Sequence, residues 1–199
     1  MKKTIFTLAL LAGLSDAAQA QHSNVSLGLK AGGAYSSFVG AQSGNASGLL
    51  GFQVGAFANL GLSDMVALQP EVLYSQKGAK ATSILGDYST RLQYIDVPLA
   101  IHVNADGLFF EAGPQIGFLL AADNKYGAFS NDVKSTFDDI DFGYLAGLGY
   151  QRKTGPGIGL RYNGGFTNLP KAVTVGGTTF QSNIRNSVFQ LYLTYSFGG

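Results

Sequence analysis

The stretch Phe189–Phe197, FQLYLTYSF, carries the clearest structural signal in the chain. Its odd positions are all large and apolar or aromatic, whereas its even positions include Gln190, Thr194 and Ser196. Such a period of two predicts a β-strand with one apolar and one polar face. The pattern alone does not tell which of the two faces meets water. A soluble sandwich turns its apolar face inward to a core, whereas a membrane barrel turns it outward to lipid.

The first 20 residues, MKKTIFTLALLAGLSDAAQA, have the form of a secretory signal peptide. Lys2 and Lys3 precede an apolar stretch that is too short to span a bilayer, and Ala18-Gln19-Ala20 fits the small-x-small cleavage pattern. We therefore expect residues 1–20 to be removed and residues 21–199 to form one domain. The chain contains no cysteine, so the exported domain depends on packing and hydrogen bonds without disulfides.

The composition is low in charge and rich in glycine. Charged residues make up 13% of the chain, about half of the fraction usual in soluble domains, and there are 28 glycines. Cleavage after residue 20 would leave equal numbers of acidic and basic side chains. No run of Lys or Arg suits a phosphate backbone, which argues against a nucleic-acid partner. A protein whose outer surface meets lipid needs little surface charge.

Seven further segments repeat the two-residue alternation. They are 25–32, 50–59, 66–77, 95–103, 108–118, 140–150 and 158–166. With the C-terminal stretch they make eight strands, most of about nine to eleven residues, the length of a tilted membrane strand.

The connections between these strands alternate strictly between short and long. Short, turn-like links lie at 61–64, 104–107 and 152–156, whereas long polar links lie at about 37–48, 78–90, 123–138 and 168–184. This rhythm is typical of a membrane barrel with short periplasmic turns and long external loops. The predicted fold is therefore an all-β, eight-stranded, antiparallel, up-and-down transmembrane β-barrel.

Seven charged residues fall on the polar face of their strands, which a barrel turns toward its lumen. They are Lys30, Glu71, Lys77, Asp96, Glu111, Asp141 and Arg161. Eight strands enclose a space just wide enough for side chains. We therefore predict a network of salt bridges that plugs the lumen, with a constricted ion path as the alternative. Many glycines share this face, where they make room for large neighbours.

Two features depart from a regular barrel pattern. Pro70, Pro98 and Pro114 lie inside predicted strands, where each loses a ladder hydrogen bond, so we expect bulges or membrane-interface positions there. Leu92 and Tyr94 have the wrong parity for an apolar outer face, which predicts a bulge near Ile95.

Four stretches resemble the PorT-like, porin-family outer-membrane β-barrel domain common in Bacteroidota. They are LQPEVLYSQKGAK (68–80), LQYIDVPLAIH (92–102), FFEAGPQIGFLLAA (109–122) and DFGYLAGLGYQ (141–151). The resemblance implies an eight-stranded barrel in the outer membrane of a Gram-negative bacterium, in contact with outer-membrane lipid. The terminal strand also resembles a signal for the barrel-assembly machinery, although Gly198 and Gly199 follow the aromatic Phe197.

The residues offer little for catalysis or for cofactor and metal binding. The chain has two histidines, His22 and His102, and no cluster of Cys and His with metal-ligand spacing. The acidic residues of 123–139 are interleaved with lysines and match no calcium loop.

We therefore predict a monomeric, non-enzymatic protein with a structural role or a role as a surface-binding platform for an unassigned external ligand. Three alternatives remain open. They are a narrow diffusion channel, an exported soluble β-barrel that binds a small ligand inside, and a lipid-modifying enzyme that uses His102.

Overall fold

The computed structural model describes residues 25–44, 46–83, 86–127 and 129–197. The expected signal peptide (1–20), His22, Gly198 and Gly199 lie outside the described residues. Within these described ranges, eleven strands and one short 3-10 helix follow one another. They are β1 (Val25–Val39), β2 (Ser47–Gly61), β3 (Val66–Ser83), β4 (Gly86–Ala105), β5 (Leu108–Tyr126), β6 (Phe129–Asp132), η1 (Lys134–Thr136), β7 (Ile140–Gln151), β8 (Gly155–Gly165), β9 (Val173–Val175), β10 (Thr178–Phe180) and β11 (Arg185–Ser196).

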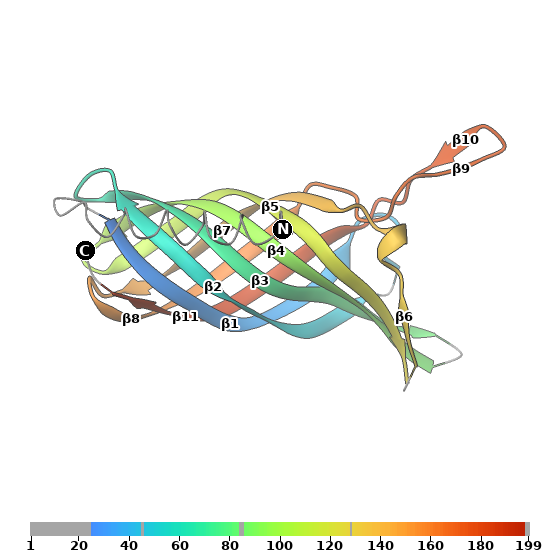
Figure 1. The fold of residues 1–199 in the computed structure, drawn as a ribbon, viewed down its shortest axis with the longest axis horizontal. Helices are drawn as coiled ribbons and strands as arrows, with labels where there is room; N and C mark the ends of the chain where they lie inside the picture. The colour runs from blue at the N-terminus through green and yellow to red at the C-terminus, as the bar shows by residue number, and fades with distance from the viewer. Residues whose placement is uncertain (1–24, 45, 84–85, 128, 198–199) are drawn as a thin grey trace, which may run out of the picture.

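Eight of these strands close into one antiparallel barrel (Figure 1). Each long strand pairs with the next long strand along the chain, and β11 returns to pair with β1 from Gly28↔Ser196 to Val39↔Arg185. β6 adds to the end of β5, and β9 and β10 form a separate hairpin. Among the described residues, no helix is both long and apolar enough to cross a membrane. The predicted fold class is confirmed.

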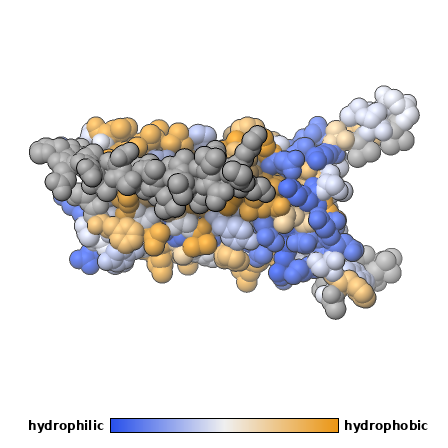
Figure 2. Space-filling model, in the orientation of Figure 1, coloured by the Kyte–Doolittle hydropathy of each residue, from blue (hydrophilic) through white to orange (hydrophobic). Residues whose placement is uncertain are grey.

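The two-residue alternation separates the outer wall from the lumen. Phe189, Leu191, Leu193, Tyr195 and Phe197 are 51–62% exposed on the outer wall. Gln190 and Tyr192, between them, are buried in the lumen. Hydrophobic residues cover much of the visible barrel wall, and a hydrophilic band lies near the end that carries β6, β9 and β10 (Figure 2). Exposing so much apolar wall to water would be costly, so the wall suits lipid.

Aromatic rings gather near both ends of this wall, as membrane barrels require at their two interfaces. Tyr144 lies 5.0 Å from Phe166 and 6.1 Å from Tyr162 between ring centroids. At the opposite end, Tyr195 and Phe197 lie 5.5 Å apart.

Three tight connections define what we call the short-turn end: residues 62–65, 106–107 and 152–154. The β4–β5 hairpin turns through Asp106 and Gly107, which both have positive φ, at 49° and 89°. Two successive positive φ values form the type I′ turn, whose twist matches that of the flanking strands. The predicted turn at 104–107 is therefore present.

The prediction of a long link between strands at 78–90 was wrong for most of these residues, because they continue the two strands. β3 and β4 stay paired from Lys77↔Leu92 out to Ser83↔Gly86, so this link is a hairpin that rises beyond the rest of the barrel (Figure 1). The reason is that both faces of a strand meet water once it leaves the membrane. The backbone ladder continues there, but the apolar alternation that reveals it in the sequence stops.

Of the two readings expected for Pro70, Pro98 and Pro114, bulges or membrane-interface positions, the described ladders exclude the bulges. Pairing keeps one register on both sides of each proline, as Pro70↔Leu99 and Pro114↔Tyr144 show. Each proline forfeits a hydrogen bond, and its intact neighbours hold the ladder in place.

The bulge predicted near Ile95 lies on the neighbouring strand instead. The register shifts between Gln93↔Ala121 and Tyr94↔Leu119, which leaves Leu120 of β5 as the extra residue. β4 itself continues without interruption, so Leu92 and Tyr94 face the lumen and are fully buried. Their apolar side chains therefore form part of an apolar section of the lumen.

We call Leu92, Tyr94, Leu119, Ala122 and Leu169 the lid cluster, because these buried residues pack together where the long loops cross the lumen. Four of them come from β4 and β5, and Leu169 comes from the loop between β8 and β9.

Backbone hydrogen bonds fix that loop. The Leu169 N–H donates to the Ile184 carbonyl at 2.8 Å, and the Asp138 N–H donates to the Leu169 carbonyl at 2.8 Å. Loops therefore close this end of the lumen with apolar side chains.

Candidate functional site: a charge network in the lumen

The seven charged residues predicted for the lumen all lie inside the barrel, each at most 5% exposed. They come from six strands: Lys30 from β1, Glu71 and Lys77 from β3, Asp96 from β4, Glu111 from β5, Asp141 from β7 and Arg161 from β8. The structure gathers them into two groups and leaves one acid apart.

The first group, the Arg161 cluster, joins Lys30, Glu71, Glu111 and Arg161. The Arg161 guanidinium donates to Glu71 through Nη1 at 3.0 Å and Nη2 at 2.8 Å. It donates to Glu111 through Nε at 2.7 Å and Nη2 at 2.6 Å. One planar guanidinium therefore holds two carboxylates, each through two hydrogen bonds, in the fork geometry for which arginine is suited.

Three more polar groups complete the partners of these carboxylates. Lys30 Nζ lies 2.6 Å from Glu71 Oε1, and Gln69 Nε2 donates to the same oxygen at 2.8 Å. The Tyr192 hydroxyl donates to Glu111 Oε1 at 2.8 Å, and its ring lies beneath Lys30 Nζ at 4.2 Å from the centroid.

The Arg161 cluster contains two acids and two cations, so it carries no net charge. All four side chains are at most 3% exposed. Removing charges from water costs several kcal/mol per ion, and only close pairing with full hydrogen bonding offsets that cost. The cluster meets both conditions, and it occupies the cross-section of the lumen with side chains from four strands.

The second group, the Lys77 cluster, is smaller. Lys77 Nζ lies 2.8 Å from Asp96, and the Ser75 hydroxyl also donates to this carboxylate. The Tyr94 ring lies beneath Lys77 Nζ at 4.7 Å from its centroid, which connects this pair to the lid cluster. This group therefore lies next to the apolar closure.

Asp141 does not join either group as an ion pair. Among the described residues, the partner that the structure gives its carboxylate is Asn186, whose Nδ2 donates to Oδ2 at 2.7 Å. The expectation that Asp141 pairs with a lumen cation is therefore not met, because an amide takes that place.

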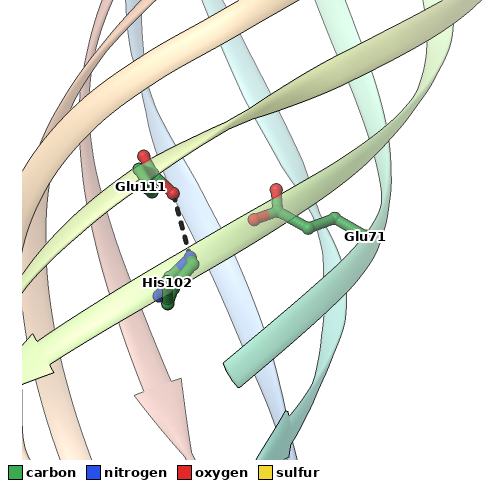
Figure 3. Close-up of side chains that lie close together, drawn as sticks. All are labelled: Glu71, His102 and Glu111. Carbon is green, nitrogen blue, oxygen red and sulfur yellow. Dashed lines mark ion pairs between the residues drawn. The ribbon is translucent and has the colours of Figure 1, made fainter. Parts of the chain in front are cut away.

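His102 adds a third side chain beside the two glutamates. Its Nε2 lies 3.1 Å from Glu111 Oε2, outside the alignment of a hydrogen bond, and its ring stacks on Phe109 at 4.8 Å. Figure 3 shows Glu71, His102 and Glu111 projecting toward the same space from β3, β4 and β5.

A carboxylate oxygen of Glu71, a carboxylate oxygen of Glu111 and a ring nitrogen of His102 lie within 4.8 Å of one another, and all three are atoms that can bind metals. Both carboxylates, however, already bind Arg161, and Glu71 also binds Lys30. A divalent cation would have to displace these cations or share their carboxylates, at a repulsive cost. We therefore assign the cluster to ion pairing.

Sequence reasoning missed the neutral members of the network. Gln69, Ser75 and Tyr192 each hydrogen-bond to a lumen carboxylate. Gln69 and Ser75 alternate in step with Glu71 and Lys77 of β3, and Tyr192 alternates in step with Gln190 of β11, so parity within the strand was the signal that could have found them.

The family of the chain follows from a direct comparison of its sequence. The model of the outer membrane protein β-barrel domain family matches residues 17–170. The chain belongs to this family. The barrel therefore lies in the outer membrane. Barrels of this kind keep short turns in the periplasm and long loops outside, which assigns the short-turn end to the periplasm and the lid cluster to the exterior.

One solved structure agrees with this fold, and two others show a weaker likeness to it. Neisserial surface protein A has a TM-score of 0.57 and 16% identity, over 87% of this chain and 99% of that one. Ail of Yersinia pestis has a TM-score of 0.45 and 14% identity, over 86% of this chain and 98% of that one.

OprG of Pseudomonas aeruginosa has a TM-score of 0.46 and 10% identity, over 89% of this chain and 98% of that one. The comparison with curated proteins finds no match. At these identities, the likeness to Neisserial surface protein A shows a shared fold.

Proposed function

We propose that this protein is a non-enzymatic outer-membrane barrel with a closed lumen, which serves as a rigid platform for its external loops. The observation that carries the proposal is the double closure of the lumen. The Arg161 cluster fills one level with paired charges, and the lid cluster fills another with apolar side chains. A solute would have to pass both.

The external end supports a platform role. The β9–β10 hairpin, β6 and the β3–β4 hairpin all extend from this end, and Phe129 and Phe180 are 77% and 61% exposed there. Loops on a rigid scaffold are the usual place for binding. Neisserial surface protein A, a surface protein by name, shares the fold.

The proposal also includes the subgroup of the family, the contact with lipid and the route of assembly. The four sequence stretches quoted in the sequence analysis support a PorT-like relationship. A phylogenetic tree that placed the chain outside the PorT-like sequences would reject this relationship. The apolar wall supports contact with outer-membrane lipid as a monomer. The aromatic end of β11 supports recognition by the barrel-assembly machinery, which truncation after Thr194 would abolish.

Single-channel recording in planar bilayers tests the closed lumen. Refolded wild-type protein should give no stable openings, because two closures lie in series. Leu169→Ser should also stay closed, since the Arg161 cluster remains. Reproducible openings of the wild type would overturn the proposal in favour of the narrow diffusion channel.

A further inference from the structure

A cavity of about 560 Å³ lies in the lumen at the short-turn end. Its inner wall includes His102 and Tyr192, which both contact Glu111, so the cavity ends against the Arg161 cluster. Its mouth includes Asp64 and Arg152 from two of the short turns. We call this cavity the vestibule, and in the orientation of the family it opens to the periplasm.

Three glycine–aromatic pairs account for the space. Directly across neighbouring strands, Gly28 pairs with Phe57, Gly149 with Phe109 and Gly159 with Tyr192. A Cβ at any of these glycines would collide with the partner ring. The rings therefore lie against the barrel wall over the glycines, which leaves the centre of the lumen open at this level.

Neutral hydrogen-bonding groups line the vestibule between these rings. Its walls include the primary amides of Asn59, Gln69, Asn104 and Gln151 and the hydroxyls of Ser26, Thr194 and Ser196. An amide carries donors and an acceptor, and a hydroxyl can act as either. Some of this capacity is used within the wall, because Asn59 Nδ2 donates to Gln69 Oε1 and the Thr194 hydroxyl donates to Gln151 Oε1, and the remainder is available to a ligand. Such a lining suits a ligand that also donates and accepts hydrogen bonds.

One deeply buried polar atom in this wall, Ser196 Oγ, lacks a hydrogen-bond partner within the described protein, on a residue that is 2% exposed. Buried polar groups are seldom left unpaired, because each costs about 1–3 kcal/mol. A bound molecule with hydroxyl groups would supply the missing partner.

The charges around the vestibule favour a ligand without net charge. At the mouth, Asp64 and Asp106 balance Arg152 and Lys153. At the inner end, the Arg161 cluster is already neutral. A charged ligand would therefore meet no unpaired opposite charge in the vestibule, and its desolvation would go uncompensated.

We propose that the vestibule binds a neutral saccharide of one or two rings from the periplasmic side. The volume lies within the range of about 300–1,000 Å³ usual for small-molecule sites. The hydroxyl groups of a saccharide match the amides, and its C–H faces can pack on the flat rings of Phe57 and His102. This binding is a function beyond the closed platform and does not require conduction.

Chemical-shift mapping by NMR tests the proposal with N,N′-diacetylchitobiose, a neutral disaccharide. The refolded protein is held in dodecylphosphocholine micelles, because this detergent has no sugar head group to compete. We expect saturable shifts near the short turns, with a dissociation constant on the order of 1 mM, as suits a small ligand with a few hydrogen bonds.

Two serine substitutions locate the site. Ser26→Trp places a large ring in the vestibule and should weaken binding at least tenfold. Ser135→Trp, on the exposed η1 at the other end, is the matched control and should leave binding unchanged. Asn104→Leu removes one amide without filling the space and should weaken binding several-fold if Ser26→Trp does not fold, as judged by heat-dependent electrophoretic mobility.

Three results would overturn the proposal. The first is the absence of saturable shifts at ten times the expected dissociation constant. The second is equal binding by wild type and a folded Ser26→Trp or Asn104→Leu variant. The third is tighter binding of glucose 6-phosphate or of dialanine, which would assign the vestibule to anions or to peptides.

Discussion

The lumen is closed at two levels that use opposite physical means. The Arg161 cluster consists of charged side chains from β1, β3, β5 and β8, all fixed to the barrel wall. The lid cluster consists of apolar side chains, and one of them, Leu169, comes from a loop. One closure is part of the barrel, and the other is laid across it.

The difference teaches where each closure draws its stability. Removing one partner from the Arg161 cluster leaves a buried charge unpaired in the wall, so the whole barrel loses stability. Removing an apolar residue from the lid leaves a void beneath a loop, and that loop can open while the strands stay paired. The two closures should therefore fail differently.

Arg161→Ala should cause the largest effect. It removes four hydrogen bonds and leaves Lys30, which pairs with Glu71, as the one lysine or arginine of the cluster for two glutamates. We expect the free energy of unfolding to fall by about 3–5 kcal/mol. Urea denaturation in lipid vesicles measures it, and Arg152→Ala in the exposed turn is the control. A loss below about 1 kcal/mol would show that water reaches the cluster.

The sequence predicts the members of this site only as far as the alternation of residues between the lipid face and the lumen face allows. Lys30, Glu71, Glu111 and Arg161 could be placed in the lumen because a charge on the lipid face is too costly. Their mutual pairing could not be predicted, because strand tilt and stagger set which levels meet across a barrel. Asp141 shares the same parity but pairs with Asn186, and alternation does not distinguish the two cases.

Leu169→Ala should cause a smaller effect than Arg161→Ala, and it should be local. The truncation leaves a void in the lid cluster and weakens loop closure by about 2–3 kcal/mol, since core Leu→Ala changes cost at least this much. Limited proteolysis between residues 166 and 184 should become roughly 30- to 150-fold faster, while urea unfolding of the barrel changes little.

Lys171→Ala, in the same loop and exposed, is the control for this prediction. Equal losses of loop and barrel stability in Leu169→Ala would break the distinction between a wall closure and a loop closure.

The lid could not have been predicted from the sequence. Leu92 and Tyr94 looked like errors of parity, because the alternation assigns apolar residues to lipid. The lumen at their level is apolar because loop residues such as Leu169, far away in the sequence, cover it. Single-strand patterns contain no information on which loop returns to pack there.

Gly28→Ala tests the open space between the Arg161 cluster and the periplasm, with a smaller effect. The added methyl group meets the Phe57 ring and the Tyr195 carbonyl, whereas a methyl group at Gly33 of the same strand meets nothing. We expect Gly28→Ala to lower the free energy of unfolding by about 1–3 kcal/mol, the usual cost of overpacking. Gly33→Ala, the matched control, should lower it by less than about 0.5 kcal/mol. Equal effects would mean that Phe57 is free to leave the wall.

Asp141→Asn should have the smallest effect and sharpens the rule for buried acids in this lumen. Asp141 has the Asn186 amide as its partner, so the isosteric change removes a buried charge without breaking an ion pair. We expect the free energy of unfolding to change by less than about 1 kcal/mol. A hydrogen bond without a cation does not offset most of the cost of burying the Asp141 charge, so removing that charge loses little stability.

Asp96→Asn is the matched change in the Lys77 cluster. It leaves the ammonium group of Lys77, which is almost fully buried, without its carboxylate partner. It should cost about 3 kcal/mol, in the range for breaking a buried pair. Urea denaturation of both variants in the same vesicles gives the comparison. A similar loss in both would mean that a cation also stabilises Asp141, and the lumen would then act as one electrostatic network.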